Sequence, residues 1–367
     1  MNVHLRLGFL PFLVLLACSD SSSPSPDGAV QDGAMDDAAP SDGPSLDAEG
    51  APMLTLVPGE APVEVAAGTL YTTVNYGEGE RQLFDAFLPA ADEPTPAVLF
   101  FHGGGFTGGN LRRAYADDTV GTLQGLVENG VAYFTVGYTL LDATGESTGV
   151  LKSLRDSQRA LQFIRYHASS FRIDPARIAV YGTSAGAGTC LWLAFHDDMA
   201  VPESGDPIAR MSTRVVAAAA QTTQSTYDLL RWADDVYSPT YPITSDVLLA
   251  DGDLGASATR FYGLDATLAN DTNALVAELN TEPLAAYRAD VDMIGLLSAD
   301  DPPFWVRNNG ADRAPGEPRF DVLHHPLHAS ALQDRANALN FEGTQIHAPA
   351  LGLGEAVDVM AFLLAHL

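Results

Sequence analysis

Cysteine and lysine are almost absent from this chain of 367 residues. Cys18 and Cys190 are the two cysteines, and Lys152 is the single lysine among 19 basic residues, against 47 acidic ones. The resulting net charge of −28 argues against nucleic acid as a partner and against electrostatic attraction to anionic lipid. Histidine and cysteine do not cluster at the spacing of metal ligands, so the sequence predicts no metal site.

The first apolar run is too short to cross a membrane. It covers residues 7–17 and follows Arg6, whereas a membrane-spanning helix needs roughly 20 apolar residues. This pattern is typical of an export signal, which we place at residues 1–18. The run ends in Leu15-Leu16-Ala17-Cys18, which resembles the bacterial lipobox, where the cysteine is lipidated and becomes the new amino terminus. An ordinary secretory signal with an incidental cysteine is the alternative.

An acidic segment follows this cysteine. Residues 19–60 are rich in Ser, Pro, Asp, Gly and Ala and contain no Lys or Arg, so we expect a disordered tether. Tether and lipobox together predict a protein at the cell envelope, a bacterial lipoprotein that contacts the membrane only through a lipid on Cys18, or else a secreted protein. If Cys18 is acylated, Cys190 is the one remaining thiol and no intramolecular disulfide can form.

Residues 61–367 form the predicted folded domain. It opens with an antiparallel strand pair at 63–76 and 81–88, where apolar residues partly alternate. Strands and helices then alternate, which predicts an α/β fold with a mostly parallel sheet and helices on both faces. Residues 222–297 interrupt this alternation, because they show no clear strand and carry several aromatic residues. Further strands are expected at 97–101, 131–138, 177–181, 214–220, 302–306 and 344–348, and helices at about 112–129, 149–170, 185–195, 328–339 and 355–367.

A glycine-flanked serine follows the strand expected at 177–181. The motif Gly182-Thr183-Ser184-Ala185-Gly186 lies between this apolar strand and a helical stretch. In such a strand–turn–helix the serine occupies a strained turn, where only small flanking residues let the strand and the helix pass each other. Its hydroxyl is then presented at the carboxyl end of the sheet, where catalytic groups gather. A small-residue turn that merely opens a helix is the alternative.

A second glycine motif ends the strand expected at 97–101. His102-Gly103-Gly104-Gly105-Phe106 presents backbone N–H groups without side chains to block them, and such donors can hold an oxyanion. Gly103, Gly105 and Gly108 also have the spacing of a phosphate-binding loop, but no lysine and no acidic residue after a following strand accompany them. We expect His102 to pack and to fix this loop rather than to react.

Together these motifs resemble those of the α/β-hydrolase superfamily, and within it the hormone-sensitive-lipase and BD-FAE-like esterases. The resemblance covers residues 80–225 well and 298–367 less well. It implies an α/β-hydrolase fold in which residues 222–297 form a cap insertion over the site. For the BD-FAE-like branch it also implies small acyl esters as substrates, such as acetyl or feruloyl groups linked to plant polysaccharide.

The resemblance further implies that a carboxylic ester is hydrolysed through an acyl-enzyme. Ser184 would attack the carbonyl carbon, and the backbone N–H groups of Gly104, Gly105 and Ala185 would hold the oxyanion. No metal or organic cofactor is needed for this reaction. Removal of one oxyanion donor typically lowers the rate by about 10²–10³.

Two aspartates are candidates for the acidic residue that orients the base of this site. Asp312 lies nine residues after Pro303, where the resembling esterases, with Pro-Pro-Phe-Leu-x-x-His-Gly-x-x-Asp, place their acid. Asp321 lies five residues before Pro326, close to the spacing in the same esterases if residues 313–320 are an insertion. Asp312 is the favoured assignment.

The base is displaced in this chain. Leu353 stands where the resembling esterases carry their catalytic histidine, and leucine cannot accept a proton. His324, His325 and His328 are better placed, on the loop beside the expected acid. We predict that His325 is the base, with Pro326 stiffening the backbone behind it. His328 is the second candidate. The alternative is that this run is only a polar entry to a helix, so that the protein is catalytically impaired and serves as a surface binding protein.

Cys18→Ser tests the predicted anchor. The substitution removes the thiol that would be acylated, so the variant should be released from membranes or incorrectly processed, whereas the parent chain partitions with them. Fractionation of cells that produce either form measures the difference. Equal membrane partition of parent and variant would contradict the lipobox.

Overall fold

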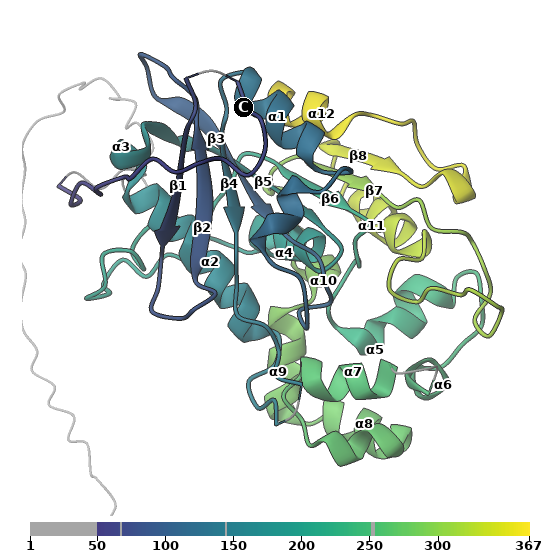
Figure 1. Ribbon diagram of the computed structural model, residues 1–367. Coiled ribbons are helices and arrows are strands. Elements are labelled where there is room, and N and C mark those ends of the chain that lie inside the picture. The colour runs from purple at the N-terminus through teal and green to yellow at the C-terminus, as the bar shows by residue number, and fades with distance from the viewer. Residues whose placement is uncertain (1–49, 67, 144, 251–253) are drawn as a thin grey trace, which may run out of the picture. The chain divides into compact units, whose positions relative to one another are not determined.

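The computed structural model describes residues 50–66, 68–143, 145–250 and 254–367 (Figure 1). The predicted export signal, Cys18 and the tether as far as residue 49 lie outside the described residues. The residues described from 50 onward belong to one compact unit.

Eight strands form a single mixed sheet in the order β1-β2-β4-β3-β5-β6-β7-β8 (Figure 1). β2 pairs antiparallel with both β1 and β4, and every other pair is parallel. The predicted α/β fold with an antiparallel opening is therefore confirmed. The strands are β1 (Leu70–Asn75), β2 (Leu83–Leu88), β3 (Thr95–Phe101), β4 (Ala132–Val136), β5 (Ile173–Thr183), β6 (Ala218–Gln221), β7 (Phe304–Arg307) and β8 (Thr344–His347).

The two central strands are continuous apolar runs because helices cover both of their faces. Residues 97–101 of β3 and 178–181 of β5 are completely buried. Side chains alternate along a strand, so Val98 and Phe100 pack into one apolar cluster and Leu99 and Phe101 into another. Strands that are buried on both faces lack the apolar–polar alternation of half-exposed ones, which is why their sequence is uniformly apolar.

The two clusters identify the helices on each face. Residues of η1, α1 and α12 pack on the side of Val98, and residues of α2, α3, α4 and α11 pack on the side of Leu99. These elements cover the predicted helical segments. Their bounds are η1 (Leu111–Tyr115), α1 (Val120–Glu128), α2 (Leu151–Tyr166), α3 (Ala168–Phe171), α4 (Ala185–Phe195), α11 (Leu327–Ala338) and α12 (Val359–His366), with η4 (Pro349–Leu351) before α12.

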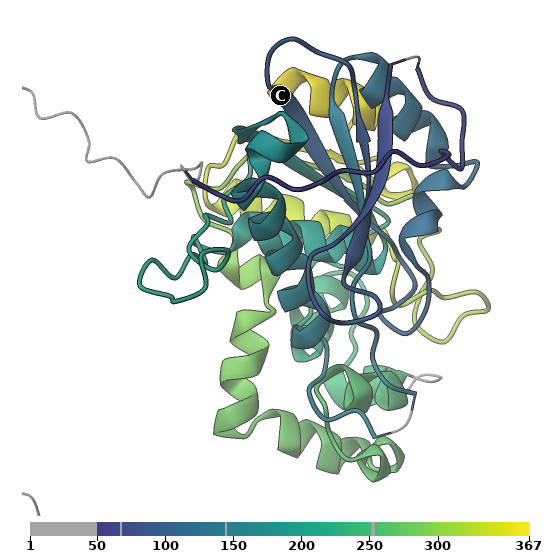
Figure 2. The same cartoon turned by 60° about the vertical axis from the view of Figure 1, so that its left-hand side comes forward.

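The described residues between β6 and β7 form mainly helices, in the segment where the sequence predicts a cap. Its helices α7, α8 and α9 lie below the strands in the views of Figures 1 and 2. This helical segment, residues 222–303, is called the insertion below. Its elements are α5 (Leu229–Arg231), η2 (Trp232–Tyr237), α6 (Ser245–Leu249), α7 (Leu254–Phe261), η3 (Ala266–Asn270), α8 (Thr272–Leu279), α9 (Glu282–Asp290) and α10 (Met293–Leu296).

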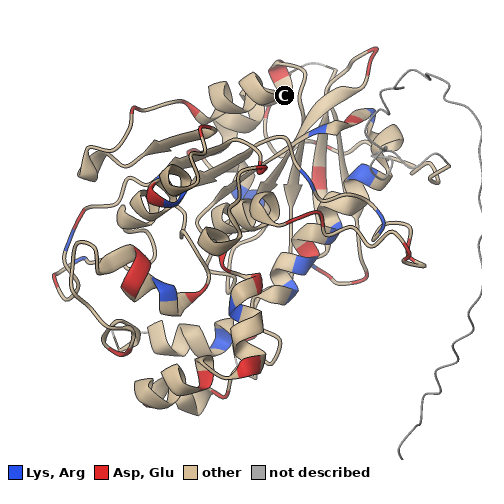
Figure 3. Ribbon diagram, turned by 180° about the vertical axis from the view of Figure 1, so that it is seen from behind, with Lys and Arg blue, Asp and Glu red and all other residues tan. Residues whose placement is uncertain are grey.

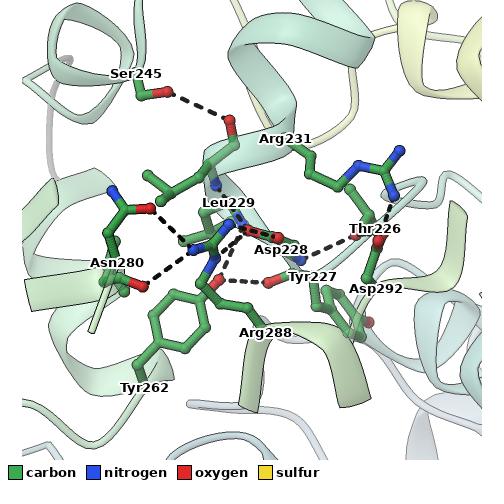
Figure 4. A network of polar contacts seen from close by, with 12 residues as sticks. Thr226, Tyr227, Asp228, Leu229, Arg231, Ser245, Tyr262, Asn280, Arg288 and Asp292 are labelled. Carbon is green, nitrogen blue, oxygen red and sulfur yellow. Dashed lines mark hydrogen bonds and ion pairs between the residues drawn. The ribbon is translucent and has the colours of Figure 1, made fainter. Parts of the chain in front are cut away.

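A buried polar network joins the beginning of the insertion to its end (Figure 4). Arg288 of α9 donates from Nε to one carboxylate oxygen of Asp228 at 2.8 Å and from Nη2 to the other at 3.0 Å. Arg231 of α5 also forms an ion pair with Asp292, through Nη1 and Oδ2. These contacts tie the entry of the insertion to its exit.

Four of the 19 basic residues lie along α2, and several of them join this helix to other segments (Figure 3). Lys152 pairs with Glu146, Arg155 with Asp290 at 2.8 Å, and Arg159 with Asp206 at 2.6 Å. Each pair joins α2 to a different segment. In a chain with a net charge of −28, these cations also offset part of the repulsion among the acidic side chains.

The domain begins earlier than the sequence predicts. The backbone N–H of Leu54 donates to Ser170 Oγ at 3.0 Å, and the Pro52 carbonyl lies 3.1 Å from His167 Nδ1. Leu54 and Leu56 pack against the core. The last residues of the predicted tether therefore contact the folded domain.

Asp228→Ala should destabilise the protein by about 3–5 kcal/mol, because it leaves the Arg288 guanidinium partly buried without its partner. Urea-induced unfolding measures the change. The matched control is Asp118→Ala, which breaks the exposed Arg113–Asp118 pair and should cost about 1 kcal/mol or less. Equal costs for the two substitutions would show that the network does not hold the insertion.

Candidate active site

Ser184 occupies a sharp turn between β5 and α4. Its φ of 52° and ψ of −120° are a strained combination for a residue with a side chain. A Cβ on Gly182 would lie 2.3 Å from the Gly186 carbonyl oxygen, and one on Gly186 would lie 2.0 Å from the Phe101 carbonyl oxygen. Glycine is therefore required on both sides of Ser184, as the motif predicts, for β5, α4 and β3 to pass each other.

A chain of hydrogen bonds leads from Ser184 to an aspartate. Ser184 Oγ lies 2.9 Å from His324 Nε2, and His324 Nδ1 lies 3.0 Å from Asp321 Oδ2. With the ring proton on Nδ1, His324 donates to the carboxylate and leaves Nε2 free to accept the serine proton. This is the arrangement that activates a serine for nucleophilic attack.

Asp321 is held in place by its own loop. One carboxylate oxygen accepts the backbone N–H groups of Leu323 at 3.1 Å and His324 at 3.2 Å. The side-chain hydrogen bond from His324, reinforced by these two N–H groups, holds the pKa of Asp321 below its ordinary value. Asp321 is therefore an ionised carboxylate at neutral pH and orients the imidazole of His324.

The loop after β7 directs His324 toward Ser184 because contacts with Gly310 and Asn308 fix the backbone of this loop. Gly310 lies against it so closely that an added Cβ would be 2.5 Å from the His324 carbonyl oxygen. Asn308 accepts the backbone N–H of Thr223 at 2.9 Å and donates to the His325 carbonyl oxygen at 3.3 Å. The ends of β6 and β7 thus jointly support the histidine loop.

The structure corrects the preference for His325. The ring of His325 is completely buried, with Nε2 3.0 Å from the Arg313 carbonyl oxygen and Nδ1 accepting the backbone N–H of Leu327 at 3.2 Å. Burial lowers its pKa. Adjacent residues of a loop point in different directions, and here His324 points to Ser184 while His325 points into the domain.

His328 also lies away from Ser184. It is fully buried at the start of α11, with Nδ1 3.1 Å from Ser225 Oγ and Nε2 3.0 Å from the Val322 carbonyl oxygen. Burial lowers the pKa of His328 to about 3, so its ring is neutral. Through Val322 it supports the turn that carries Asp321 and His324.

Asp312, the favoured acid, contacts a different group of residues. Its carboxylate accepts a hydrogen bond from Tyr241 Oη at 2.7 Å and lies 3.6 Å from His325 Nε2. Of the two aspartates left open by the sequence, the structure thus brings Asp321 to the histidine that contacts Ser184. Asp321 and His324 are three residues apart in one turn, and this spacing is the signal that could have selected both.

Leu353 occupies the loop after β8. Its backbone pairs with Ala348 and its side chain packs against the core. The position of the usual histidine is therefore a packing position in this chain.

The glycine loop after β3 lies beside the serine. A Cβ on Gly103 would be 3.1 Å from Ser184 Cβ, and Gly104 and Gly105 have φ of 121° and 59°, which favours glycine. Within the described part of the chain, the backbone N–H groups of Gly104 and Gly105 donate to no protein acceptor. They remain available for an oxyanion, as does the first N–H of α4 at Ala185.

His102 holds this loop from below. Its ring stacks on Tyr138 with centroids 4.2 Å apart, and Tyr138 Oη donates to the His102 carbonyl oxygen at 2.6 Å. Nδ1 lies 2.8 Å from the Gly103 carbonyl oxygen, and burial lowers the pKa of His102 to about 4. A neutral, stacked imidazole fixes the loop, in agreement with the packing role expected from the sequence.

Comparisons with known proteins identify the fold. Residues 84–235 match the model of the family described as BD-FAE. A solved truncated carbohydrate esterase from gut microbiota superposes with a TM-score of 0.50 at 16% identity, covering 76% of this chain and 88% of that one. This chain has the α/β-hydrolase fold.

Other known proteins are also similar to this chain. The acetyl ester-xyloside bifunctional hydrolase of Caldicellulosiruptor lactoaceticus superposes with a TM-score of 0.50 at 16% identity, covering 82% of this chain and 94% of that one. The chlorogenic acid esterase of Aspergillus niger is 28% identical over 138 residues, 34% of this chain and 27% of that protein. The neuroligin-like protein glit-1 of Caenorhabditis elegans is 31% identical over 105 residues, 28% of this chain and 13% of that protein. The chain thus spans about a quarter or less of the curated relatives it matches.

A cavity of about 210 Å³ opens at Ser184. The α/β-hydrolase core contributes Ser184, Ala185 and the glycine loop, and the insertion contributes much of the remaining wall. Apolar and aromatic side chains dominate the lining, among them Phe106, Leu141, Leu229, Trp232, Leu254 and Phe261. The described residues contain no group of three or more metal-ligand side chains and no helix able to cross a membrane.

Asp321→Asn and His324→Ala should each lower kcat for 4-nitrophenyl acetate by about 10³-fold or more, since each breaks the hydrogen-bonded chain to Ser184. Asp312→Asn is the matched control, because it removes the same charge from the same loop without touching His324. Its kcat should stay within about twofold of the parent value. Near-parental kcat in His324→Ala would exclude His324 as the base.

Proposed function

We propose that this α/β-hydrolase is a serine carboxylesterase that cleaves small acyl esters through an acyl-enzyme. The carrying observation is the Ser184–His324–Asp321 chain, with Oγ to Nε2 at 2.9 Å and Nδ1 to Oδ2 at 3.0 Å. It supplies the base that the sequence lacks at Leu353. The alternative of a catalytically impaired surface binding protein rested on that missing base, and the contact of His324 with Ser184 removes its main argument.

In the first half-reaction, Ser184 Oγ attacks the ester carbonyl carbon while His324 Nε2 takes the hydroxyl proton. The developing negative charge on the carbonyl oxygen is stabilised by the backbone N–H groups of Gly104, Gly105 and Ala185. The imidazolium of His324 then gives its proton to the leaving alcohol, and the acyl group stays on Ser184.

In the second half-reaction, His324 takes a proton from water, which attacks the acyl-enzyme carbonyl. Collapse of this intermediate returns the proton to Ser184 Oγ and releases the carboxylic acid. Asp321 stays ionised throughout and stabilises the imidazolium form of His324, consistent with its lowered pKa.

The size and lining of the cavity support small acyl groups as substrates. Its volume of about 210 Å³ and its apolar walls suit a short acyl chain. The names of the carbohydrate esterase and the chlorogenic acid esterase among the relatives support esters that are attached to larger polar molecules, including polysaccharides. We further propose, from the Leu15–Cys18 sequence, that a lipid on Cys18 places this activity at the cell envelope.

A fluorophosphonate probe tests the proposed function directly. It forms a covalent bond only with an activated serine, so it should label the parent protein and fail to label Ser184→Ala. Ser169→Ala removes an exposed serine of α3 that lies outside the Gly182–Gly186 turn, so this variant should label like the parent. A parent protein that resists the probe would refute the acyl-enzyme and favour the binding protein.

A further inference from the structure

Arg260 is one of the residues that line the cavity of Ser184. It lies near the end of α7 and is the one charged side chain among the described residues that line this cavity. Most of the other lining side chains are apolar, and the polar ones are neutral. In such surroundings a charge is weakly screened and exerts a strong pull on an ion of opposite sign.

The Arg260 side chain has no protein partner in the described part of the chain. The insertion contains three arginines and no lysine. Arg231 pairs with Asp235 and Asp292, and Arg288 pairs with Asp228, but no ion pair or side-chain hydrogen bond of Arg260 occurs among the described residues. With respect to the described residues, the donors of Arg260 are therefore free for a ligand.

Two acidic residues that line a neighbouring cavity together with Arg260 have other hydrogen-bond partners. Arg260 also lines a neighbouring cavity of about 570 Å³, together with Glu146 and Asp265. Glu146 accepts hydrogen bonds from Lys152 and from the backbone N–H groups of its own loop, and Asp265 accepts the backbone N–H of Thr267 at 2.8 Å. Neither carboxylate hydrogen-bonds to Arg260.

Ser257 adds a second free donor one helical turn before Arg260. Residues three apart on a helix are neighbours on its surface, and both line the cavity. The Ser257 hydroxyl makes no hydrogen bond within the described ranges. α7 therefore offers the cavity a guanidinium and a hydroxyl side by side, a set of donors that matches a carboxylate.

We propose that Arg260, assisted by Ser257, binds a carboxylate carried by the substrate, so that this esterase prefers anionic esters. The inference rests on the proposed esterase function. An anionic ester is repelled by the net charge of −28 at long range, so its selection depends on a local cation within the cavity. The carboxylate can belong to the acyl part or to the alcohol part of the ester, and the two sources are separated by experiment.

Two pairs of esters distinguish these sources. For the acyl side, mono-4-nitrophenyl glutarate is compared with 4-nitrophenyl pentanoate, which has the same chain length and no charge. For the alcohol side, 4-acetoxybenzoate is compared with the neutral 4-acetoxybenzamide. Arg260→Gln should lower kcat/KM for the anionic ester of at least one pair by about 10- to 100-fold, the value of a charge-assisted hydrogen bond. The neutral esters should change by less than about threefold.

Two further variants control for charge. Arg260→Lys keeps the charge without the planar fork of donors, so it should restore part of the preference. Arg112→Gln removes an exposed arginine outside the cavity and should leave all four rates unchanged, which excludes an effect of net charge alone. Equal effects of Arg260→Gln on anionic and neutral esters in both pairs would overturn the inference while leaving the esterase function intact.

If the parent protein hydrolyses none of the four esters, the proposed function fails, and glutarate binding still tests the carboxylate site. Trp232 lines the same cavity, so its fluorescence should respond to bound glutarate. Saturable titration of the parent and a lost response in Arg260→Gln would support the site. Indistinguishable titrations of parent and variant would overturn it.

Discussion

The backbone crossing at Gly186 fixes the serine of the candidate site relative to the glycine loop. At this point α4 passes so close to the end of β3 that an added Cβ would lie 2.0 Å from the Phe101 carbonyl oxygen. The residue that follows Phe101 is His102, the first of the glycine loop. One contact between two backbones therefore places Ser184 and the proposed oxyanion donors side by side, although about 80 residues separate them in the sequence.

The fold and half of the site could be predicted because their signals are local. The apolar runs of β3 and β5 and the glycines around Ser184 are contiguous residues whose spacing reflects strands and a tight turn. The base could not be chosen in this way. His324 and His325 are neighbours, and the path of the loop alone decides which of them points to Ser184. Asp321 accepts hydrogen bonds from the backbone N–H groups two and three residues ahead of it. This pattern is common for aspartate in turns, and it favours Asp321 over Asp312 as the acidic residue of the site.

The core and the insertion divide the work of the cavity. The sheet ends supply the serine, the histidine loop and the glycine loop, whereas Leu229, Trp232, Leu254 and Arg260 of the insertion supply much of the lining. Reactivity thus depends on the sheet, and the choice of substrate depends on helices of the insertion, whose entry and exit the Asp228–Arg288 pair joins. A scaffold with this division can change its substrates through the insertion without disturbing the chemistry.

The single turn that carries both Asp321 and His324 makes them one mechanical unit. Where acid and base come from separate loops, each can be displaced on its own and leave a partly working pair. Here a shift of one short segment would withdraw both groups from Ser184 together, so the nucleophile is either fully supported or left alone. The loop after β8, where Leu353 packs against the core, then contributes no residue to the proposed reaction.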